Sequence, residues 1–321
     1  MKAICYHRYG SPDVLALEEV DKPVAGDGRV LVRVVAASVN PLDWHFMRGL
    51  PYFVRLMSGL RKPKNSRAGV DVSGRVEAVG AGVTQFRPGD EVFGGGDGSF
   101  AEFVSGSEKS FEPKPAGLTF EQAAAVPIAG CTALQALRDR GQLRAGQSVL
   151  INGAAGGVGT FAVQIAKSFG AEVTAVCSAK NVELVRSIGA DHVVDYAAED
   201  FTRTGRQYDL ILDAVGNRSL SDLRRALTPE GALVLVGGGG GRLLGPMTQI
   251  LRARILTRLG GKRMVTFFAS VNKADLHVLA QLIEAGKVSP VIDRTYPLSQ
   301  TADAIRYLET GHARGKVVVA V

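Results

Sequence analysis

Residues 148–159 read SVLINGAAGGVG, and this stretch constrains the fold of the chain more than any other. The apolar run VLIN is followed by a glycine-rich turn and then by TFAVQIAKSFG, whose apolar residues have the spacing of a helix packed on one broad face. Glycine is costly in unfolded-state entropy, so the turn must gain from the missing side chains. A strand, a tight turn and a helix in this order predict the start of a parallel α/β sheet.

The positions of the glycines predict what this turn binds. Gly156 and Gly159 fit the last two glycines of the dinucleotide-binding fingerprint, and Ala154 takes the place of the first. The bare backbone can approach a pyrophosphate, whose charge is favoured at a helix amino terminus. A turn that only packs helix on strand is the alternative, but strand, turn, helix and second strand in order favour a dinucleotide. The residues expected to line the pyrophosphate are Ala155, Gly156, Gly157, Val158 and Gly159.

The end of the next strand, EVTAVCSAKN, predicts which dinucleotide is bound. NAD sites usually carry an Asp or Glu about 20 residues after the turn, and its carboxylate accepts a hydrogen bond from the ribose 2′-hydroxyl. This chain has no acid there and offers Ser178 and Lys180 instead. A hydroxyl and an ammonium suit a 2′-phosphate, so the sequence predicts NADPH in preference to NADH. A solvent-exposed lysine without a ligand is the alternative for Lys180.

Strand-like and helix-like segments are arranged differently along the chain. Up to about residue 120, β-branched runs such as RVLVRVVAASV are separated by glycine and proline, which predicts a mainly antiparallel β domain. After it, apolar runs such as YDLILDA alternate with helix-like segments, which predicts a doubly wound parallel sheet covered on both faces. The fold class is therefore α/β. Residues 1–120, with 287–321 returning to them, form the first domain, and residues 121–286 form the dinucleotide-binding domain.

The charge of the chain bears on its partners. Among 321 residues, 38 Lys and Arg stand against 31 Asp and Glu, a formal net charge of +7. The basic residues are scattered apart from RARILTRLGGKR at 252–263. We therefore expect a basic surface around a phosphorylated cofactor and no nucleic-acid partner, with a polyanionic partner as the alternative.

Cysteine usage and hydropathy exclude further classes. Cys5, Cys131 and Cys177 are far apart and form no CxxC pair, which argues against a disulfide framework and against a cysteine-rich zinc site. The first ten residues lack the apolar core of a signal peptide, and no apolar segment is long enough to span a bilayer. The sequence thus predicts a cytoplasmic protein with no integral membrane segment.

Three further motifs carry a family resemblance: VNPLDWHFMRG, GVDVSGRVEAVGAGVTQFRPGDEVFG and AGCTALQAL. With the glycine turn, they closely resemble the medium-chain dehydrogenase/reductase superfamily, and most of all its zinc-free quinone oxidoreductase branch, over nearly the whole chain. The resemblance implies a GroES-like, mainly antiparallel catalytic domain, a Rossmann domain, a cleft between them for nicotinamide and substrate, and a homodimer.

Two departures from the zinc-dependent relatives indicate that no metal is bound. Those relatives place a Cys where this chain has Asn40, and a His–Glu pair where it has Val70 and Asp71. Catalytic zinc needs three Cys, His or carboxylate ligands, which Asn and Val cannot supply. His45, beside Trp44, is expected to be a packed aromatic neighbour.

The absence of zinc predicts the substrate class. Without a Lewis acid, hydride transfer favours acceptors that are already activated, such as quinones and α,β-unsaturated carbonyls. The sequence therefore predicts an NADPH-dependent quinone or enone oxidoreductase that transfers hydride from nicotinamide C4. The alternatives are an NADPH-dependent reductase of ordinary ketones or aldehydes, and a low-turnover NADPH-binding protein with an RNA-binding or structural role.

Three residues are the candidates for catalysis. The resemblance places Asn40 at the nicotinamide and substrate end of the cleft, where its amide could donate to a substrate oxygen; a turn residue before Pro41 is the alternative. Tyr52 is a candidate proton donor or stacking ring, or else an ordinary surface tyrosine. Thr132 matches a threonine near the nicotinamide carboxamide, or it bonds back to a helix carbonyl. Asp43 and Asp71 are expected to be structural acceptors. Cys131 is not expected to be a nucleophile, because no histidine lies near it in sequence.

The resemblance also supplies residues for the rest of the cofactor. Strand ends are expected to contact adenosine phosphate, adenine ribose and nicotinamide ribose in turn, and Phe268 and Arg314 to reach nicotinamide and a phosphate. Each has a structural alternative as a strand-end, core or exposed turn residue. These further cofactor residues are Tyr196, Val215, Gly216, Val236, Gly237, Phe268 and Arg314. The 46–67 loop and residues 238–263 have no assigned role.

Overall fold

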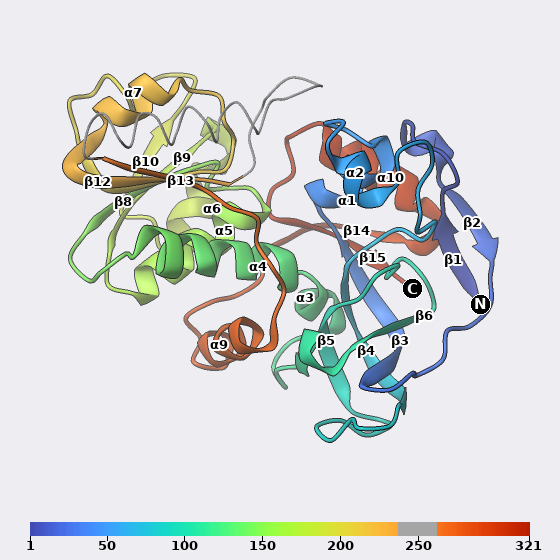
Figure 1. The fold of residues 1–321 in the computed structure, drawn as a ribbon. Coiled ribbons are helices and arrows are strands. Elements are labelled where there is room, and N and C mark those ends of the chain that lie inside the picture. Colours follow the sequence, from blue (N-terminus) through green and yellow to red (C-terminus); the bar gives the residue numbers. More distant parts are fainter. Residues whose placement is uncertain (237–261) are drawn as a thin grey trace. The chain divides into compact units, whose positions relative to one another are not determined.

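The computed structural model describes residues 1–236 and 262–321, and the chain divides into two compact units. Unit 1 contains residues 1–131, 270–285 and 290–321, and unit 2 contains residues 132–269 and 286–289. Figure 1 shows the elements of each unit in the colours of the sequence. Gly237 and most of 238–263 fall outside the described residues, so what was expected of Gly237 has no structural counterpart here.

Unit 1 is built on a mainly antiparallel sheet. Its strands run in the order β14-β15-β3-β4-β5-β7, with β6 paired to β3 and only β14 and β15 parallel. A separate hairpin joins β1 and β2. The strands are β1 (Lys2–Cys5), β2 (Ala16–Glu19), β3 (Arg29–Val39), β4 (Asp71–Val79), β5 (Glu91–Gly95), β6 (Phe103–Ser107), β7 (Phe111–Pro113), β14 (Ile292–Pro297) and β15 (Lys316–Ala320). The helices are α1 (Pro41–Arg48), α2 (Val54–Ser58), α3 (Phe120–Ala124), α9 (Lys273–Glu284) and α10 (Thr301–Glu309).

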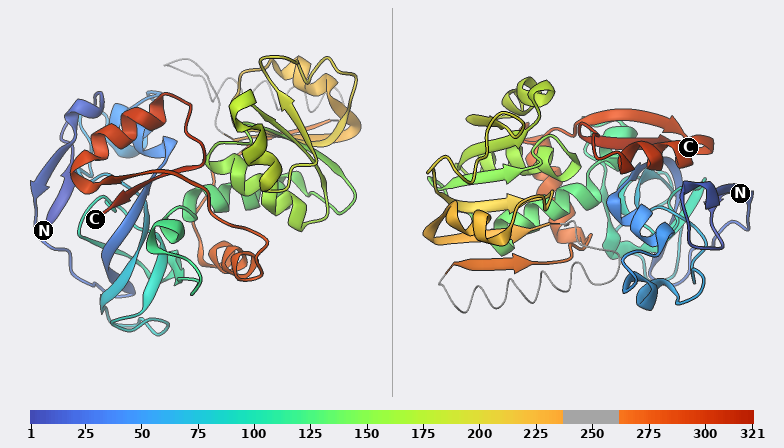
Figure 2. Two further views of the ribbon diagram at one scale, coloured as in Figure 1. Left: turned by 180° about the vertical axis from the view of Figure 1, so that it is seen from behind. Right: turned by 90° about the horizontal axis from the view of Figure 1, so that it is seen from above.

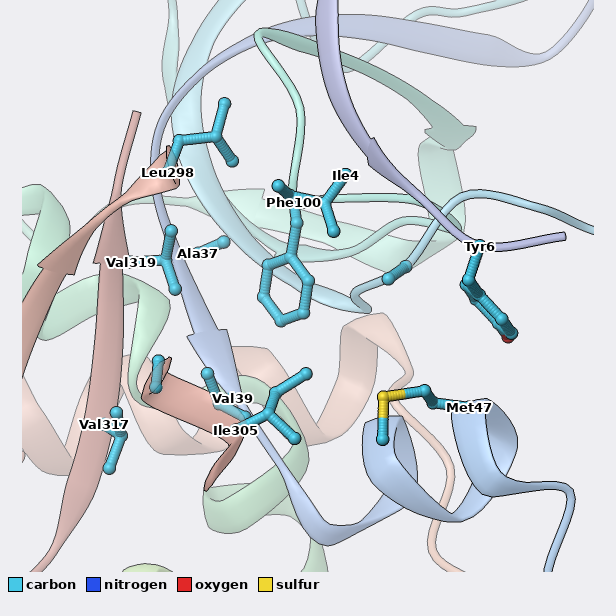
Figure 3. Close-up of a cluster of buried hydrophobic side chains, with 12 residues drawn as sticks. Ile4, Tyr6, Ala37, Val39, Met47, Phe100, Leu298, Ile305, Val317 and Val319 are labelled. Atoms are coloured by element: carbon cyan, nitrogen blue, oxygen red, sulfur yellow. The ribbon is translucent and has the colours of Figure 1, made fainter. Parts of the chain in front are cut away.

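The core of unit 1 joins the two ends of the chain. Figure 3 shows Phe100 among side chains from β1, β3, β15 and α10, including Ile4, Val39 and Ile305. Burial of these large apolar side chains is the main favourable term in folding. The C-terminal strand β15 pairs with β3, the strand that leads into Asn40.

Unit 2 is built on a six-stranded parallel sheet in the order β10-β9-β8-β11-β12-β13. Figure 2 shows this unit from two further directions. Helices α5 and α6 link β8, β9 and β10 in one direction, and α7 links β11 to β12 in the other. Because crossovers have one hand, the two directions place helices on opposite faces. The elements are β8 (Ser148–Asn152), α5 (Gly157–Ser168), β9 (Glu172–Cys177), α6 (Val182–Ser187), β10 (His192–Asp195), β11 (Tyr208–Asp213), α7 (Leu220–Arg225), β12 (Leu227–Leu235) and β13 (Arg263–Thr266). Helix α4 (Pro127–Leu134) and the π-helical turn Gln135–Gly141 precede β8.

These units confirm the expected α/β class with one antiparallel and one parallel sheet. The compact units differ from the expected division of the chain at residues 121–131 and 270–285, which group with unit 1, and at 287–289, which group with unit 2. Helix α9 packs on β7 there, and His277 contacts the buried Glu112 at 2.7 Å. An amphipathic helix after a Rossmann strand gives no sequence signal of which sheet it covers.

In the described ranges, no helix combines the length and the apolar character that crossing a bilayer would demand.

Candidate functional site

The strand order of unit 2 creates a switch point between β8 and β11. From β8 the chain winds outward through β9 and β10, then returns to β11 on the other side of β8. Ligands of open parallel sheets bind at the carboxyl ends of the strands at such a point. Here Asn152 ends β8 and Asp213 ends β11, and Asn152 Nδ2 donates to Asp213 Oδ1 at 2.9 Å.

Asp213 organises the loop that follows β11. Its Oδ1 also accepts the backbone N–H groups of Val215 (3.1 Å) and Gly216 (2.9 Å), and Gly216 has a φ of 72° that glycine adopts at little cost. Its Oδ2 is buried and has no hydrogen-bond partner among the described residues. A buried carboxylate oxygen normally has a donor, so a ribose hydroxyl is a fitting partner.

Sequence reasoning missed both Asn152 and Asp213. The signal was present, because each is a polar residue at the last position of an otherwise apolar strand, in VLIN and LILD. Nothing in the sequence, however, showed that these two strand ends are neighbours.

The glycines of the 153–159 turn have different physical reasons. Gly153 has a φ of 86°, in the left-handed region that favours glycine. A Cβ on Gly159 would lie 2.1 Å from the Gly153 carbonyl oxygen, so close packing of α5 on β8 requires glycine there. A Cβ on Gly156 would meet nothing closer than 3.4 Å. The protein alone therefore does not require glycine at 156, whereas a ligand that approaches this backbone would.

The amino terminus of α5 offers donors to that ligand. Gly156 is the N-cap in extended conformation, and no side chain of the described residues caps it. Gly157 and Val158 follow in the first turn, and the first internal bond runs from the Thr160 N–H to the Gly156 carbonyl. Amides and helix dipole together favour an anion here. The turn thus fits a pyrophosphate, as the sequence predicts.

The ends of β9 and β10 bring the predicted 2′-phosphate residues together. Ser178 follows β9 and accepts Asn181 Nδ2 at 3.2 Å, and the backbone N–H of Tyr196 donates to the Cys177 carbonyl at 3.1 Å. Lys180 is exposed in the turn after Ser178. Asp195 pairs in register with Cys177, so an acid stands on the neighbouring strand, where its Oδ1 accepts the amide of residue 197.

Burial keeps the Cys177 thiol protonated. Burial first, and the Asp195 charge second, raise the pKa of Cys177 to about 11. A thiol with this pKa is neither a nucleophile nor a metal ligand at neutral pH. The carboxyl edge of the sheet therefore presents Ser178 and Lys180 as its polar groups at this strand end.

The remaining predicted cofactor residues lie in three places. Val236 follows β12, where its N–H donates to the Asp213 carbonyl at 2.8 Å, so it shares the sheet edge with Val215. Phe268 follows β13 in unit 2 and is 76% exposed. Arg314 belongs to unit 1, where its N–H donates to Asp293 Oδ2 at 2.8 Å. The sheet edge of unit 2 thus gathers the strand-end residues, whereas Arg314 belongs to unit 1.

A second polar cluster lies in unit 1 around Asn40, which is 2% exposed. Its Nδ2 donates to Asp71 Oδ2 at 2.8 Å and to the Ser38 carbonyl at 3.3 Å, and its Oδ1 accepts Lys316 Nζ at 2.5 Å. Both Nδ2 protons therefore have acceptors inside the protein. The longer bond to Ser38 is the weaker one, and its proton is the one that a substrate oxygen would compete for.

Asp43 caps helix α1 from within the same region. Its Oδ2 accepts the Asn40 backbone N–H at 2.7 Å, which is one half of a capping box. Burial is the largest cause that raises the pKa of Asp43 to about 7; the nearby Asp71 carboxylate also raises it, and the Asn40 N–H and Lys316 lower it. The sequence identified Asp43 and Asp71 as acceptors, but gave no sign of Lys316 as their partner.

The other candidate side chains have local partners. His45 Nδ1 donates to the Leu50 carbonyl at 2.8 Å, and its ring centroid lies 3.6 Å from that of Trp44. Tyr52 is 46% exposed, with the Arg55 guanidinium 4.9 Å from its ring centroid. Thr132 is buried in α4. The structure therefore places Tyr52, but not Thr132, at the surface of the protein.

Potential metal ligands are not gathered in the described ranges. Residues 1–236 and 262–321 contain no group of three or more His, Cys, Asp or Glu side chains placed to hold a metal ion. Asp71, which the family resemblance aligns with part of a zinc-ligand pair, is instead buried among Ser38, Asn40 and Lys316.

A GroES-like antiparallel unit joined to a Rossmann unit with this glycine turn defines a two-domain nicotinamide-type oxidoreductase fold. The family model of the alcohol dehydrogenase GroES-like domain matches residues 26–136, and the model described as zinc-binding dehydrogenase matches residues 188–319. The chain belongs to the medium-chain dehydrogenase/reductase superfamily, in its quinone oxidoreductase-like branch, and it is an enzyme.

Individual relatives extend the likeness over both units. The chain is 33% identical to the chloroplast envelope quinone oxidoreductase homolog of Arabidopsis thaliana, over 99% of this chain and 98% of that protein. It is 36% identical to the chloroplastic NADPH-dependent alkenal/one oxidoreductase of the same plant, over 99% of this chain and 79% of that protein. Among solved structures, the quinone oxidoreductase from Coxiella burnetii is similar with a TM-score of 0.87 and 31% identity, over 100% of this chain and 99% of that one.

Proposed function

We propose that this enzyme is an NADPH-dependent reductase of quinones or α,β-unsaturated carbonyl compounds and that it works without a metal ion. The observation that carries the proposal is the turn at Gly156, where the fold tolerates a side chain but the chain has none, next to the α5 amides. The Arabidopsis relatives, named for quinone and for NADPH-dependent alkenal/one chemistry, support the substrate class.

The residues of unit 2 would hold the cofactor, which supplies the hydride when bound. The α5 amides would bind the pyrophosphate, and Ser178 and Lys180 would bind the 2′-phosphate as hydroxyl and ammonium donors. Asp213 Oδ2, buried without a donor, would accept a ribose hydroxyl. These contacts fix the dinucleotide at the sheet edge and orient its reactive ring.

The residues of unit 1 would act on the substrate oxygen. Asn40 has a carboxamide where a zinc enzyme would have a thiolate. Of the two hydrogen bonds that its Nδ2 donates, the one to the Ser38 carbonyl is the weaker. Donation of that proton would stabilise the negative charge that develops on a quinone or enone oxygen. An acceptor that delocalises charge needs no stronger electrophile, which is why the proposal excludes metal assistance.

The test is NADPH oxidation by purified enzyme with a matched panel of a quinone, an enone, a saturated ketone and an aldehyde, each with and without a chelator. We expect turnover of the quinone or enone, at least about tenfold slower turnover of the saturated carbonyls, and no effect of the chelator. Loss of activity on chelation, restored by zinc, would contradict the proposal. Preference for saturated carbonyls, or tight NADPH binding with no turnover of any member, would favour the two alternative functions.

A further inference from the structure

Lys316 is a buried lysine whose three N–H bonds all end inside unit 1. Its side chain is 3% exposed, and Nζ lies 3.2 Å from the Val39 carbonyl, 2.5 Å from Asn40 Oδ1 and 3.4 Å from Asp71 Oδ2. A buried ammonium is expensive unless it is paired and fully hydrogen-bonded, as it is here. The bond to Asn40 is the shortest of the three. Lys316 Nζ therefore lies closer to Asn40 Oδ1 than to the carboxylate of Asp71, its ion-pair partner.

Asp71 connects this lysine to three other elements. Its Oδ2 accepts Ser38 Oγ (2.8 Å) and Asn40 Nδ2 (2.8 Å) as well as Lys316, and its Oδ1 accepts the Ile128 backbone N–H (3.0 Å) in the first turn of α4. That helix carries Thr132 one turn later. One carboxylate thus ties the end of β3, the start of β4, strand β15 and helix α4 to each other.

The orientation of the Asn40 carboxamide depends on the charges at its two ends. A cation at Oδ1 and a carboxylate at Nδ2 allow only one of the two carboxamide orientations, because the flipped one would place N–H against ammonium and oxygen against carboxylate. The flipped orientation would also turn the second N–H away from Ser38. Lys316 and Asp71 therefore determine where the Asn40 N–H points.

We infer that Lys316 is a positioning residue, which together with Asp71 locks the Asn40 carboxamide in its donating orientation for the substrate oxygen. The inference rests on the proposed function of Asn40. Lys316 itself donates nothing to substrate, because its three N–H bonds are occupied. The opposing interpretation is that the ion pair stabilises unit 1 and has no effect on the geometry of Asn40.

A pair of variants separates these two interpretations. Lys316→Met removes the cation at similar length and leaves Asp71 as an uncompensated buried charge, so we expect the melting temperature to fall by about 10 °C. Lys316→Met combined with Asp71→Asn removes both charges, so most of that loss should be recovered. In the double variant the new amide at 71 presents N–H to Asn40, which favours the flipped carboxamide.

The two interpretations, that Lys316 positions Asn40 and that its ion pair only stabilises unit 1, predict different outcomes for the double variant. With positioning, kcat for the quinone or enone stays about 100-fold below native although the melting temperature recovers, and the Kd for NADPH changes by less than about threefold. Recovery of kcat together with the melting temperature would overturn the inference. Lys109→Met, at an exposed lysine of the same unit, is the matched control and should leave both quantities at native values.

A second measurement does not depend on activity. Hydrogen exchange of the Asn40 side-chain amide protons, followed by ¹⁵N NMR on the full chain, should be at least about tenfold faster in the double variant than in native enzyme and in Lys109→Met. Unchanged exchange would overturn the inference. If the native enzyme reduced no quinone or enone, the proposed function would fail, and this exchange rate would still decide whether Lys316 holds Asn40.

Discussion

Asp43 shows how one buried residue makes the stability of this enzyme depend on pH. Its carboxyl faces Asp71 of β4, Lys316 of β15 and Tyr6 beside β1, and burial is the largest cause that raises its pKa from 3.8 to about 7. The folded chain therefore holds this proton more tightly than the unfolded chain does. The stability that the proton confers is complete below about pH 4 and is lost as the pH rises towards 7.

Asp43→Asn should remove this dependence and keep the cap, because an amide oxygen can still accept the Asn40 N–H. The free energy of unfolding of the native enzyme, relative to this variant, should fall by about 1.4 kcal/mol per pH unit between pH 5 and 6 and become constant above pH 8. Urea unfolding at a series of pH values measures this difference. A native-minus-variant difference that stays constant between pH 5 and 8 would show that Asp43 is already ionised in the folded enzyme over this range.

At the scale of elements, two glycines in the segment from β8 through the turn to α5 have different roles. Gly159 is needed for packing, and Gly156 is explained by a ligand. Gly159→Ala places a Cβ 2.1 Å from the Gly153 carbonyl oxygen, so it should destabilise the chain by about 1–3 kcal/mol. Gly156→Ala meets nothing closer than 3.4 Å, so it should cost less than about 1 kcal/mol as a poorer N-cap.

Gly156→Ala should nevertheless bind NADPH at least about tenfold more weakly, because a methyl group at 156 occupies the approach to the pyrophosphate. Denaturant unfolding and cofactor fluorescence titration give the two quantities for each variant. Native NADPH affinity in Gly156→Ala would show that this backbone is not in contact with the dinucleotide.

The sequence predicts these elements well where the signal is local. The strand, turn and helix around Gly156 follow from periodicity and glycine within a short stretch, and so do the α/β class and the strand ends at Ser178 and Val215. Contacts between distant segments gave no such signal. Lys316 meets Asp71 across 245 residues, and Asn152 meets Asp213 across 61, so only the assembled sheets bring them together.

At the scale of the whole molecule, the likeness to relatives covers both units, and each unit contains its own polar cluster. Unit 2 carries the glycine turn and the strand ends suited to a dinucleotide, and unit 1 carries the Asn40–Asp71–Lys316 cluster. The net charge of +7 fits a chain whose cofactor carries several phosphate charges.

Calorimetric titration of the purified enzyme with NADPH and with NADH tests the central claim most directly, since Ser178 and Lys180 would favour the 2′-phosphate of NADPH and the neighbouring Asp195 would disfavour it. We expect NADPH to bind at least about tenfold more tightly than NADH, and Lys180→Ala to remove most of that difference while Arg186→Ala, an exposed cation on α6, leaves it unchanged. Equal affinity for the two cofactors, or no binding of either, would contradict the account.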